Sequence, residues 1–273
     1  MTNTKQQVRE FYDQIGWSHI GEGLYQNARY EDLRLVSRKY IHKCHLRVKR
    51  HLSSSGMFLL DAGSGPVQWP EYLTYSDNYR FHLCVDLSIV ALKEARTKLG
   101  KHGLYVVADI ANLPFQNDSI DGEVSMHAIH HLPVSEHKRA FLELFRVLKP
   151  GHSAVIVNGW DNPMLMRVAE PLIQLGRLLN GRGIKRKKKW SEEDEQVGTH
   201  VKKLTPAWLK KEMAGIIDYD IYAWRSLSPR FMRWFVRPKL GGQMLLNILF
   251  WLEDVFPRFF GNYGQYPIIV MNK

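Results

Sequence analysis

Cysteine is scarce in this sequence of 273 residues, which contains only Cys44 and Cys84. Two cysteines without the spacing of metal ligands exclude a disulfide framework and predict a reducing, cytoplasmic location. Long apolar runs are scarce as well, because the longest, residues 244–252, is interrupted by Asn247 and is too short to span a bilayer. The opening stretch "MTNTKQQVREFYDQ" lacks the apolar centre of a signal peptide. We therefore expect a protein that is soluble or at most peripheral to a membrane.

Acidic residues are outnumbered by basic ones, 27 against 38, and the formal net charge is +11. A positive excess of this size favours nucleic-acid binding, but its distribution argues against it. The lysine run at residues 185–190 is followed directly by the acidic residues 191–195, a pattern typical of a solvated loop that neutralises itself. Most of the remaining excess lies in residues 34–50 and 225–237. We expect no stable nucleic-acid partner.

Internal repeats and low-complexity segments are absent, and strand and helix patterns alternate instead. Residues 1–55 have a helical pattern throughout, and residues 161–273 are rich in helical patterns with two further expected strands, 219–226 and 266–273. Between residues 57 and 160, strand and helix patterns alternate strictly, and this predicts a parallel sheet with helices on both faces. The five expected central strands are residues 57–62, 80–86, 104–109, 120–127 and 152–160.

The segment "FLLDAGSGP" places Gly63 and Gly65 directly after the first central strand. Glycine adopts positive φ easily and lets a ligand approach the bare backbone, although an ordinary tight turn has the same pattern. Asp86 ends the second strand, near the spacing of a carboxylate that accepts from two ribose hydroxyls. Because residue 68 is glutamine and Pro70 delays the next helix, the turn suits a nucleoside better than a pyrophosphate.

Four segments in register, over about residues 55–160, resemble the class I S-adenosylmethionine-dependent methyltransferases. The segments are "LLDAGSGP", "VDLS", "VVADIANLPFQNDSID" and "LFRVLKPGHSAVIV". The resemblance is closest to the small-molecule "type 11" group, which includes quinone methyltransferases. It implies S-adenosylmethionine as the cofactor and an α/β fold, with a doubly wound, Rossmann-like, mostly parallel seven-stranded sheet and helices on both faces. The sequence departs from the pattern at Val67, where many relatives carry a third glycine.

The resemblance also implies roles for individual residues at the cofactor. The turn after the first strand would line the methionine and ribose, Asp86 would accept from the ribose hydroxyls, and Asp109 would accept from the adenine amino group. Leu87 and Ile110 would pack against the adenine, and Met126 would border the methionine. The residues of the turn are Asp61, Ala62, Gly63, Ser64 and Gly65.

The stretch "FYDQIGW" resembles the lid helix of the family, which would place Tyr12 and Trp17 over the cofactor. Packing of this aromatic stripe onto the core explains the pattern equally well. A lid would exclude water from the aligned reactants.

Histidines are concentrated in "MHAIHHLP", at the end of the fourth strand. His127 and His131 would share a face if this segment is helical, but no acidic partner motif adjoins them, and we expect no metal. Imidazole titrates near neutral pH, so His127 or His131 is a candidate general base. His200 precedes an expected helix that starts at Pro206, and it resembles a histidine that faces the substrate pocket in relatives.

We predict one domain, residues 1–273, with N-terminal lid helices (1–55), a cofactor-binding core (56–160) and a helical acceptor cap with the closing strands (161–273). The expected reaction is methyl transfer to oxygen or nitrogen of a small, partly apolar or aromatic metabolite. The alternatives are a prenylated quinone or lipid at a membrane surface, an RNA substrate, and a non-catalytic cofactor-binding protein. The helices between 161 and 260 could roof the acceptor pocket or lie on a membrane, and the sequence favours the roof. The oligomeric state stays open.

Overall fold

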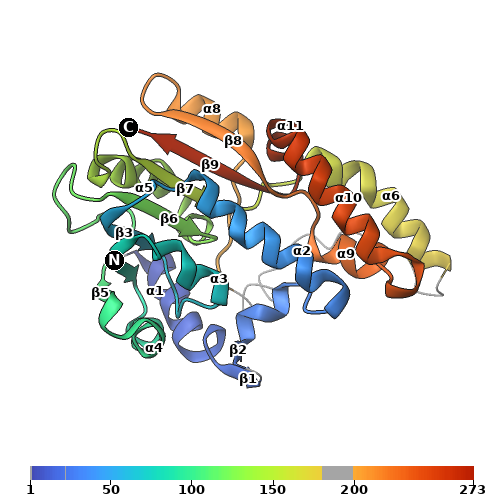
Figure 1. Ribbon diagram of the computed structural model, residues 1–273, viewed down its shortest axis with the longest axis horizontal. Coiled ribbons are helices and arrows are strands. Elements are labelled where there is room, and N and C mark those ends of the chain that lie inside the picture. The colour runs from blue at the N-terminus through green and yellow to red at the C-terminus, as the bar shows by residue number, and fades with distance from the viewer. Residues whose placement is uncertain (1, 22, 180–198) are drawn as a thin grey trace.

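A computed structural model describes residues 2–21, 23–179 and 199–273, and its centre is a seven-stranded sheet (Figure 1). The strands lie in the order β5-β4-β3-β6-β7-β9-β8. β9 is antiparallel to both of its neighbours, and the pairs from β5 to β7 are parallel. This confirms the predicted fold class, including both C-terminal strands. The strands are β3 Gly56–Ala62, β4 Tyr79–Asp86, β5 Gly103–Val107, β6 Gly122–Met126, β7 Ser153–Val157, β8 Asp218–Arg225 and β9 Tyr266–Asn272.

Both faces of the sheet are covered by helices, so its central strands are apolar at nearly every position. Every residue of β6 and β7 is buried. Neighbouring residues of a strand point to opposite faces, and Leu59 and Leu60 therefore belong to different core clusters. One cluster packs against α2 Leu35–Leu46, α4 Ile89–Leu99 and α10 Gly242–Val255, and the other against α5 Val134–Val147 and α8 Pro206–Met213.

The strand order reverses beside β3, which pairs with β4 on one side and β6 on the other. In an open parallel sheet, the turns that follow such strands leave the sheet in opposite directions and open a crevice at their carboxyl ends. The turns after β3 and β6 therefore define the place for a ligand.

The N-terminal segment is less regular than its sequence pattern predicts. Helix α1 Asn3–Phe11 continues into a π-helical turn, Tyr12–Gly16. A short antiparallel hairpin follows, formed by β1 His19–Gly21 and β2 Leu24–Tyr25. The expectation of helices throughout residues 1–55 is therefore wrong here, because Gly21 and Gly23 take the positive φ values of a reversing chain.

The C-terminal part contributes helices that pack at one end of the sheet (Figure 1). They are α6 Met164–Leu179, α9 Pro229–Phe235, α10 and α11 Pro257–Tyr263. Helix α10 packs against α2 and β8, and α11 packs closely on β8. The close approach of α11 depends on Gly261, because a Cβ atom there would lie 2.5 Å from the carbonyl carbon of Tyr222. The charged runs at residues 185–190 and 191–195 lie outside the described residues.

Candidate active site

A cavity of about 530 Å³ lies at the carboxyl ends of β3, β4 and β6. Its lining combines the turn after β3, the end of β4, the turn after β6 and the N-terminal segment. This volume is in the range of small-molecule sites. The predicted site residues that line it are Tyr12, Trp17, Asp61, Gly63, Ser64, Asp86, Leu87, Asp109, Ile110, Met126, His127 and His131.

The turn after β3 has the bare backbone that the glycines predict. Gly63 and Gly65 have φ values of 76° and 53°. A Cβ atom on Gly63 would lie 2.3 Å from the Cβ atom of Ala128, and one on Gly65 would lie 2.9 Å from the indole ring of Trp17. Both positions therefore require glycine for space as well as for conformation.

Val67 takes over the conformation of the absent third glycine. Its φ is 47°, which a β-branched residue rarely adopts. Lys98 of α4 donates to the backbone oxygens of Pro66 and Val67, at 2.8 and 2.9 Å. These two hydrogen bonds fix the course of the loop until α3 Pro70–Leu73 begins at Pro70, as expected.

Asp86 ties the end of β4 to the glycine turn. Its carboxylate accepts from the backbone N–H groups of Gly65 and Ser88, at 2.9 and 2.8 Å. Burial raises the pKa of Asp86 to about 6, and these two hydrogen bonds oppose the shift. A carboxylate has about four acceptor positions, so two remain for ribose hydroxyls.

Asp61 stands at one end of a buried chain of hydrogen bonds that the sequence does not reveal. Its carboxylate lies 3.1 Å from Nε2 of His82, and Nδ1 of the same ring lies 2.9 Å from Oγ of Ser76. Asp61 and His82 are almost fully buried. The chain fixes the carboxylate at the cavity floor, and His82 was missed because nothing in the pattern of β4 distinguishes it from a core position.

Asp109, the expected acceptor for the adenine amino group, is bound to Lys5 of α1. The ammonium of Lys5 also contacts Glu136, and its side chain is only 4% exposed. Asp109 additionally accepts from the backbone N–H of Ala111 at 2.9 Å. Lys5 therefore anchors the N-terminal segment to Asp109 at the cavity, a role that an isolated lysine in a polar helix does not reveal.

Tyr12 closes the cavity from the N-terminal side through His131. Nδ1 of His131 lies 2.8 Å from the backbone oxygen of His200, which can only accept, so this nitrogen carries the proton. Nε2 then accepts from the hydroxyl of Tyr12 at 2.9 Å. Tyr12 also stacks on Trp17, with ring centroids 4.7 Å apart, and this arrangement supports the prediction that the segment is a lid.

We expect Tyr12→Phe to leave the fold intact and to weaken cofactor binding. The variant keeps the aromatic stack but removes one hydrogen bond, worth about 0.5–1.5 kcal/mol, so the cofactor Kd should rise about threefold to tenfold. Calorimetric titration with S-adenosylhomocysteine measures this. A variant with unchanged affinity and unchanged protection of the N-terminal segment from proteolysis would contradict the lid.

The three candidate histidines differ in position. His127 has a φ of 57°, and its ring contacts those of Trp224 and Tyr266, at centroid distances of 5.1 and 5.5 Å. Burial, and next the positive charge of Arg225, lower the pKa of His127 to about 3. Burial lowers the pKa of His131 to about 4. Both imidazoles are therefore neutral at pH 7.

His200 does not belong to the lining of the cavity, although we expected its side chain to face the substrate pocket. Its neighbours Thr199 and Val201 belong to the lining, while His200 itself contributes its backbone oxygen to His131. The predicted role of its side chain at the acceptor is therefore without support in the structure.

Two cations on the acceptor side of the cavity were not predicted. Arg225 at the end of β8 is almost fully buried and forms an ion pair with Glu31 at 2.6 Å. Lys203 packs against Gly159, and burial lowers the pKa of its ammonium. No carboxylate partner of Lys203 occurs among the described residues.

Among the described residues, the N-terminal segment contributes to the lining of the cavity and the C-terminal helices do not. From the described part of residues 161–260, only Thr199, Val201, Lys203 and Arg225 belong to the lining. The described residues of α6, α9, α10 and α11 lie outside it. Within residues 2–21, 23–179 and 199–273, no group of three His, Cys, Asp or Glu side chains is arranged to hold a metal ion.

The strand order, the antiparallel β9, the glycine turn and the acidic residues after two neighbouring strands are features of the fold of class I S-adenosylmethionine-dependent methyltransferases. The donor set fits S-adenosylmethionine, because the backbone is bare at Gly63 and Gly65 and the carboxylate of Asp86 keeps acceptor positions that would meet ribose hydroxyls. Residues 60–156 match the family described as "Methyltransferase domain". Fold class, cofactor and family resemblance are thus confirmed.

Similar proteins modify different kinds of molecule. One relative, 32% identical over 46% of this chain and 33% of its own, is the tRNA (carboxymethyluridine(34)-5-O)-methyltransferase of Arabidopsis thaliana. Another, 30% identical over 42% of each chain, is phthiotriol/phenolphthiotriol dimycocerosates methyltransferase 1 of Mycobacterium ulcerans. This chain thus spans less than half the length of these relatives. The geranyl diphosphate C-methyltransferase of Streptomyces coelicolor A3(2) superposes with a TM-score of 0.60, at 14% identity over 99% of this chain and 98% of that one.

Proposed function

We propose that the whole chain, acting as one domain, transfers a methyl group to oxygen or nitrogen of a small, partly apolar or aromatic metabolite. The observation that carries the proposal is one cavity that joins the glycine turn to the aromatic side chains of Trp69, Tyr72 and Tyr266. When bound, the cofactor supplies a methyl group activated on a sulfonium. The protein has to hold the acceptor in line with it, and such alignment is worth about 7–11 kcal/mol.

His127 is the better of the two candidate bases. Both ring nitrogens of His131 are engaged, by Tyr12 and by the backbone of His200. No described residue forms a hydrogen bond with the ring of His127. A base with a pKa of about 3 accepts protons weakly, so His127 can act only if the acceptor releases its proton easily, and Lys203 and Arg225 would favour this by stabilising the negative charge of a phenolate. With S-adenosylmethionine held at the glycine turn and Asp86, the cofactor would supply the methyl group, and His127 would take up the proton that the acceptor oxygen releases.

Replacing His127 with asparagine tests this role. Asparagine tolerates positive φ, so the backbone of the turn is retained, and kcat with a phenolic acceptor should fall about 10²–10⁴-fold. His131→Asn is the matched comparison, and it should raise the KM for the cofactor more than it lowers kcat. Full turnover by the His127 variant would remove this residue from the mechanism.

A lipid or prenylated quinone is the second candidate acceptor. It is favoured by the exposed apolar side of α10, where Met244 and Trp251 are 67% and 61% exposed. The phthiotriol relative also acts on a lipid according to its name. Incubation with labelled cofactor, and either a phenol panel or a lipid extract, separates the two candidates by where the label appears.

A tRNA substrate is supported by the net charge and by one relative, whereas "SMHAIHHL" stands where a nucleic-acid methyltransferase of the "NPPY" type would carry its catalytic segment. We retain the prediction of no stable nucleic-acid partner. Retention of RNA in a gel shift at moderate salt would contradict it. We also retain a cytoplasmic location as a proposal, and no described helix is long and apolar enough to cross a membrane.

A further inference from the structure

Helix α10 is apolar on its exposed side as well as on its buried side. Leu246 and the carboxylate of Glu253 are completely buried, whereas Met244 and Trp251 are mostly exposed. A surface helix of a globular protein normally directs its apolar stripe to the core and its charged residues to water. Two questions follow, namely what fixes α10 in this orientation and what its exposed apolar side binds.

The cause is a polar anchor on the buried side. Glu253 accepts from the hydroxyl of Tyr40 at 2.7 Å, from Nη1 of Arg47 at 2.6 Å, and from the backbone N–H of Ser226 at 2.8 Å. A buried charge that lost these partners would be strongly destabilising. The helix is thus fixed, and its apolar side stays exposed.

The exposed apolar side forms one continuous strip, which we call the α10 face. Four of its residues, 244, 248, 251 and 255, have the spacing of one side of a helix. All its members are at least 46% exposed. The α10 face consists of Met244, Leu245, Ile248, Trp251 and Val255. Three further apolar residues are exposed after it, Phe256 at the end of α10 and Phe259 and Tyr263 of α11, which are 43–52% exposed.

Five cations lie on the two segments that adjoin α10. Arg38, Lys39 and Lys43 lie on α2, the helix that packs beside α10, and Arg237 and Lys239 precede α10 in the chain. None of these five cations has a carboxylate partner within the described part of the chain. The one exposed acid of α10, Asp254, is already neutralised by Arg47 and Arg50.

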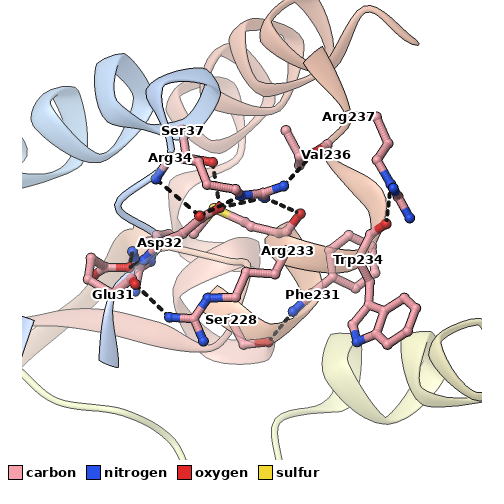
Figure 2. A network of polar contacts seen from close by, with 12 residues as sticks. Glu31, Asp32, Arg34, Ser37, Ser228, Phe231, Arg233, Trp234, Val236 and Arg237 are labelled. Carbon is pink, nitrogen blue, oxygen red and sulfur yellow. Dashed lines mark hydrogen bonds and ion pairs between the residues drawn. The ribbon is translucent and has the colours of Figure 1, made fainter. Parts of the chain in front are cut away.

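Helix α9 joins this region firmly to the rim of the cavity (Figure 2). Arg233 donates to the backbone oxygens of Arg29 and Glu31, at 2.9 and 2.6 Å. In the opposite direction, Arg34 donates to the last carbonyls of α9 at Met232 and Val236, at 2.8 and 3.1 Å.

The orientation of Arg34 is set by Asp32, which accepts two hydrogen bonds of 2.7 Å from its guanidinium. Tyr30 and Glu31 in the same loop line the cavity, and Tyr30 is 61% exposed. A surface seated on the α10 face would thus be fixed relative to the cavity entrance.

From this geometry we infer that the α10 face docks on the surface of an anionic lipid bilayer. Apolar side chains with tryptophan would enter the headgroup boundary, and the flanking cations would meet the lipid phosphates. A second copy of this chain fits less well, because a two-fold symmetric contact would bring the same cations together. Docking is independent of methyl transfer. A protein that does not dock can still transfer the methyl group, and one that does not transfer it can still dock.

Pelleting with sucrose-loaded vesicles tests the inference at about 0.15 M salt. The vesicles are phosphatidylcholine, with or without about one third phosphatidylglycerol. We expect the protein to pellet with the anionic vesicles and the double variant Met244→Ser, Trp251→Ser to stay mostly in solution. Ile216→Ser, at another exposed apolar position (47% exposed), is the matched control and should pellet like the original chain. The pair Arg237→Gln, Lys239→Gln should lower binding to anionic vesicles about fivefold for each charge removed.

Tryptophan quenching by brominated acyl chains distinguishes insertion from adsorption by net charge. Anionic vesicles should quench the original chain, and Trp251→Phe should lose most of the quenching while it still pellets. Equal pelleting by the double serine variant and the original chain would overturn the inference. So would light scattering that shows a dimer, without lipid, that the double serine variant abolishes, because the occupant would then be a second copy.

Discussion

Gly63→Ala is expected to abolish most cofactor binding. The new methyl group would lie 2.3 Å from the Cβ atom of Ala128, at a φ of 76°. The turn after β3 and the turn that carries His127 would therefore have to move apart. Overpacking costs up to about 3 kcal/mol, which corresponds to about 10²-fold in an equilibrium constant, so the Kd for S-adenosylhomocysteine should rise by up to about this factor. Calorimetry measures the Kd, and thermal unfolding measures the accompanying loss of stability.

Gly151→Ala is the control that separates the cost of the positive φ from the cost of the steric clash. Gly151 has nearly the same φ, 78°, but no atom lies within 4 Å of its added Cβ, so this variant carries the conformational cost of about 1–2 kcal/mol alone. Gly63→Ala should add about 1–3 kcal/mol for overpacking. If both variants bind the cofactor like the original chain, the glycine turn is not the cofactor cradle.

The core of the fold could be predicted because local signals agreed with one another. Apolar runs, glycine or proline at each boundary and the alternation with helices all indicated the same sheet, and β8 and β9 were also found. The hairpin β1–β2 was missed because two strands of three and two residues carry too little periodicity to be distinguished from helix. Its signal was the pair Gly21 and Gly23.

The cofactor side of the site was predictable for a different reason from the acceptor side. Asp61, Gly63 and Asp86 lie where strands end, so a linear pattern determines their position. Lys5 and Arg225 act through partners more than a hundred residues away, Asp109 and Glu31. Such pairs depend on tertiary packing, and nothing in the neighbouring sequence distinguishes them from ordinary surface charges.

Which side of α10 is exposed was also not predictable from the sequence, for the same reason. Its sequence is rich in Met, Trp and Phe, which favoured a buried roof over the cavity. The outcome depends on Glu253, a single carboxylate whose donors are Tyr40 of α2, Arg47 directly after α2, and Ser226 directly after β8. Because those donors are known only from the fold, the sequence could not tell which side of α10 faces water.

Cofactor affinity is expected to fall as the pH falls through about 6, because Asp86 becomes protonated there. Its pKa is raised to about 6, mainly by burial, and only the carboxylate can accept from both ribose hydroxyls while it holds Gly65 and Ser88. If the ionised form alone binds, the apparent Kd at pH 5 should be about tenfold higher than at pH 7. Titration at several pH values measures this.

Acid unfolding through Asp86 does not explain such a loss. A carboxyl whose pKa is higher in the folded state than in the unfolded chain destabilises the fold above about pH 6, and this cost is relieved as the pH falls toward 3.8. As far as Asp86 alone is concerned, the protein should be more stable at pH 5 than at pH 7 while it binds the cofactor less well. Asp86→Asn should bind weakly at both pH values with little pH dependence, since its amide leaves one backbone N–H without an acceptor, at a cost of about 1–3 kcal/mol. A variant that kept the tenfold dependence would show that another group titrates, and Asp86 would lose its assigned role at the ribose.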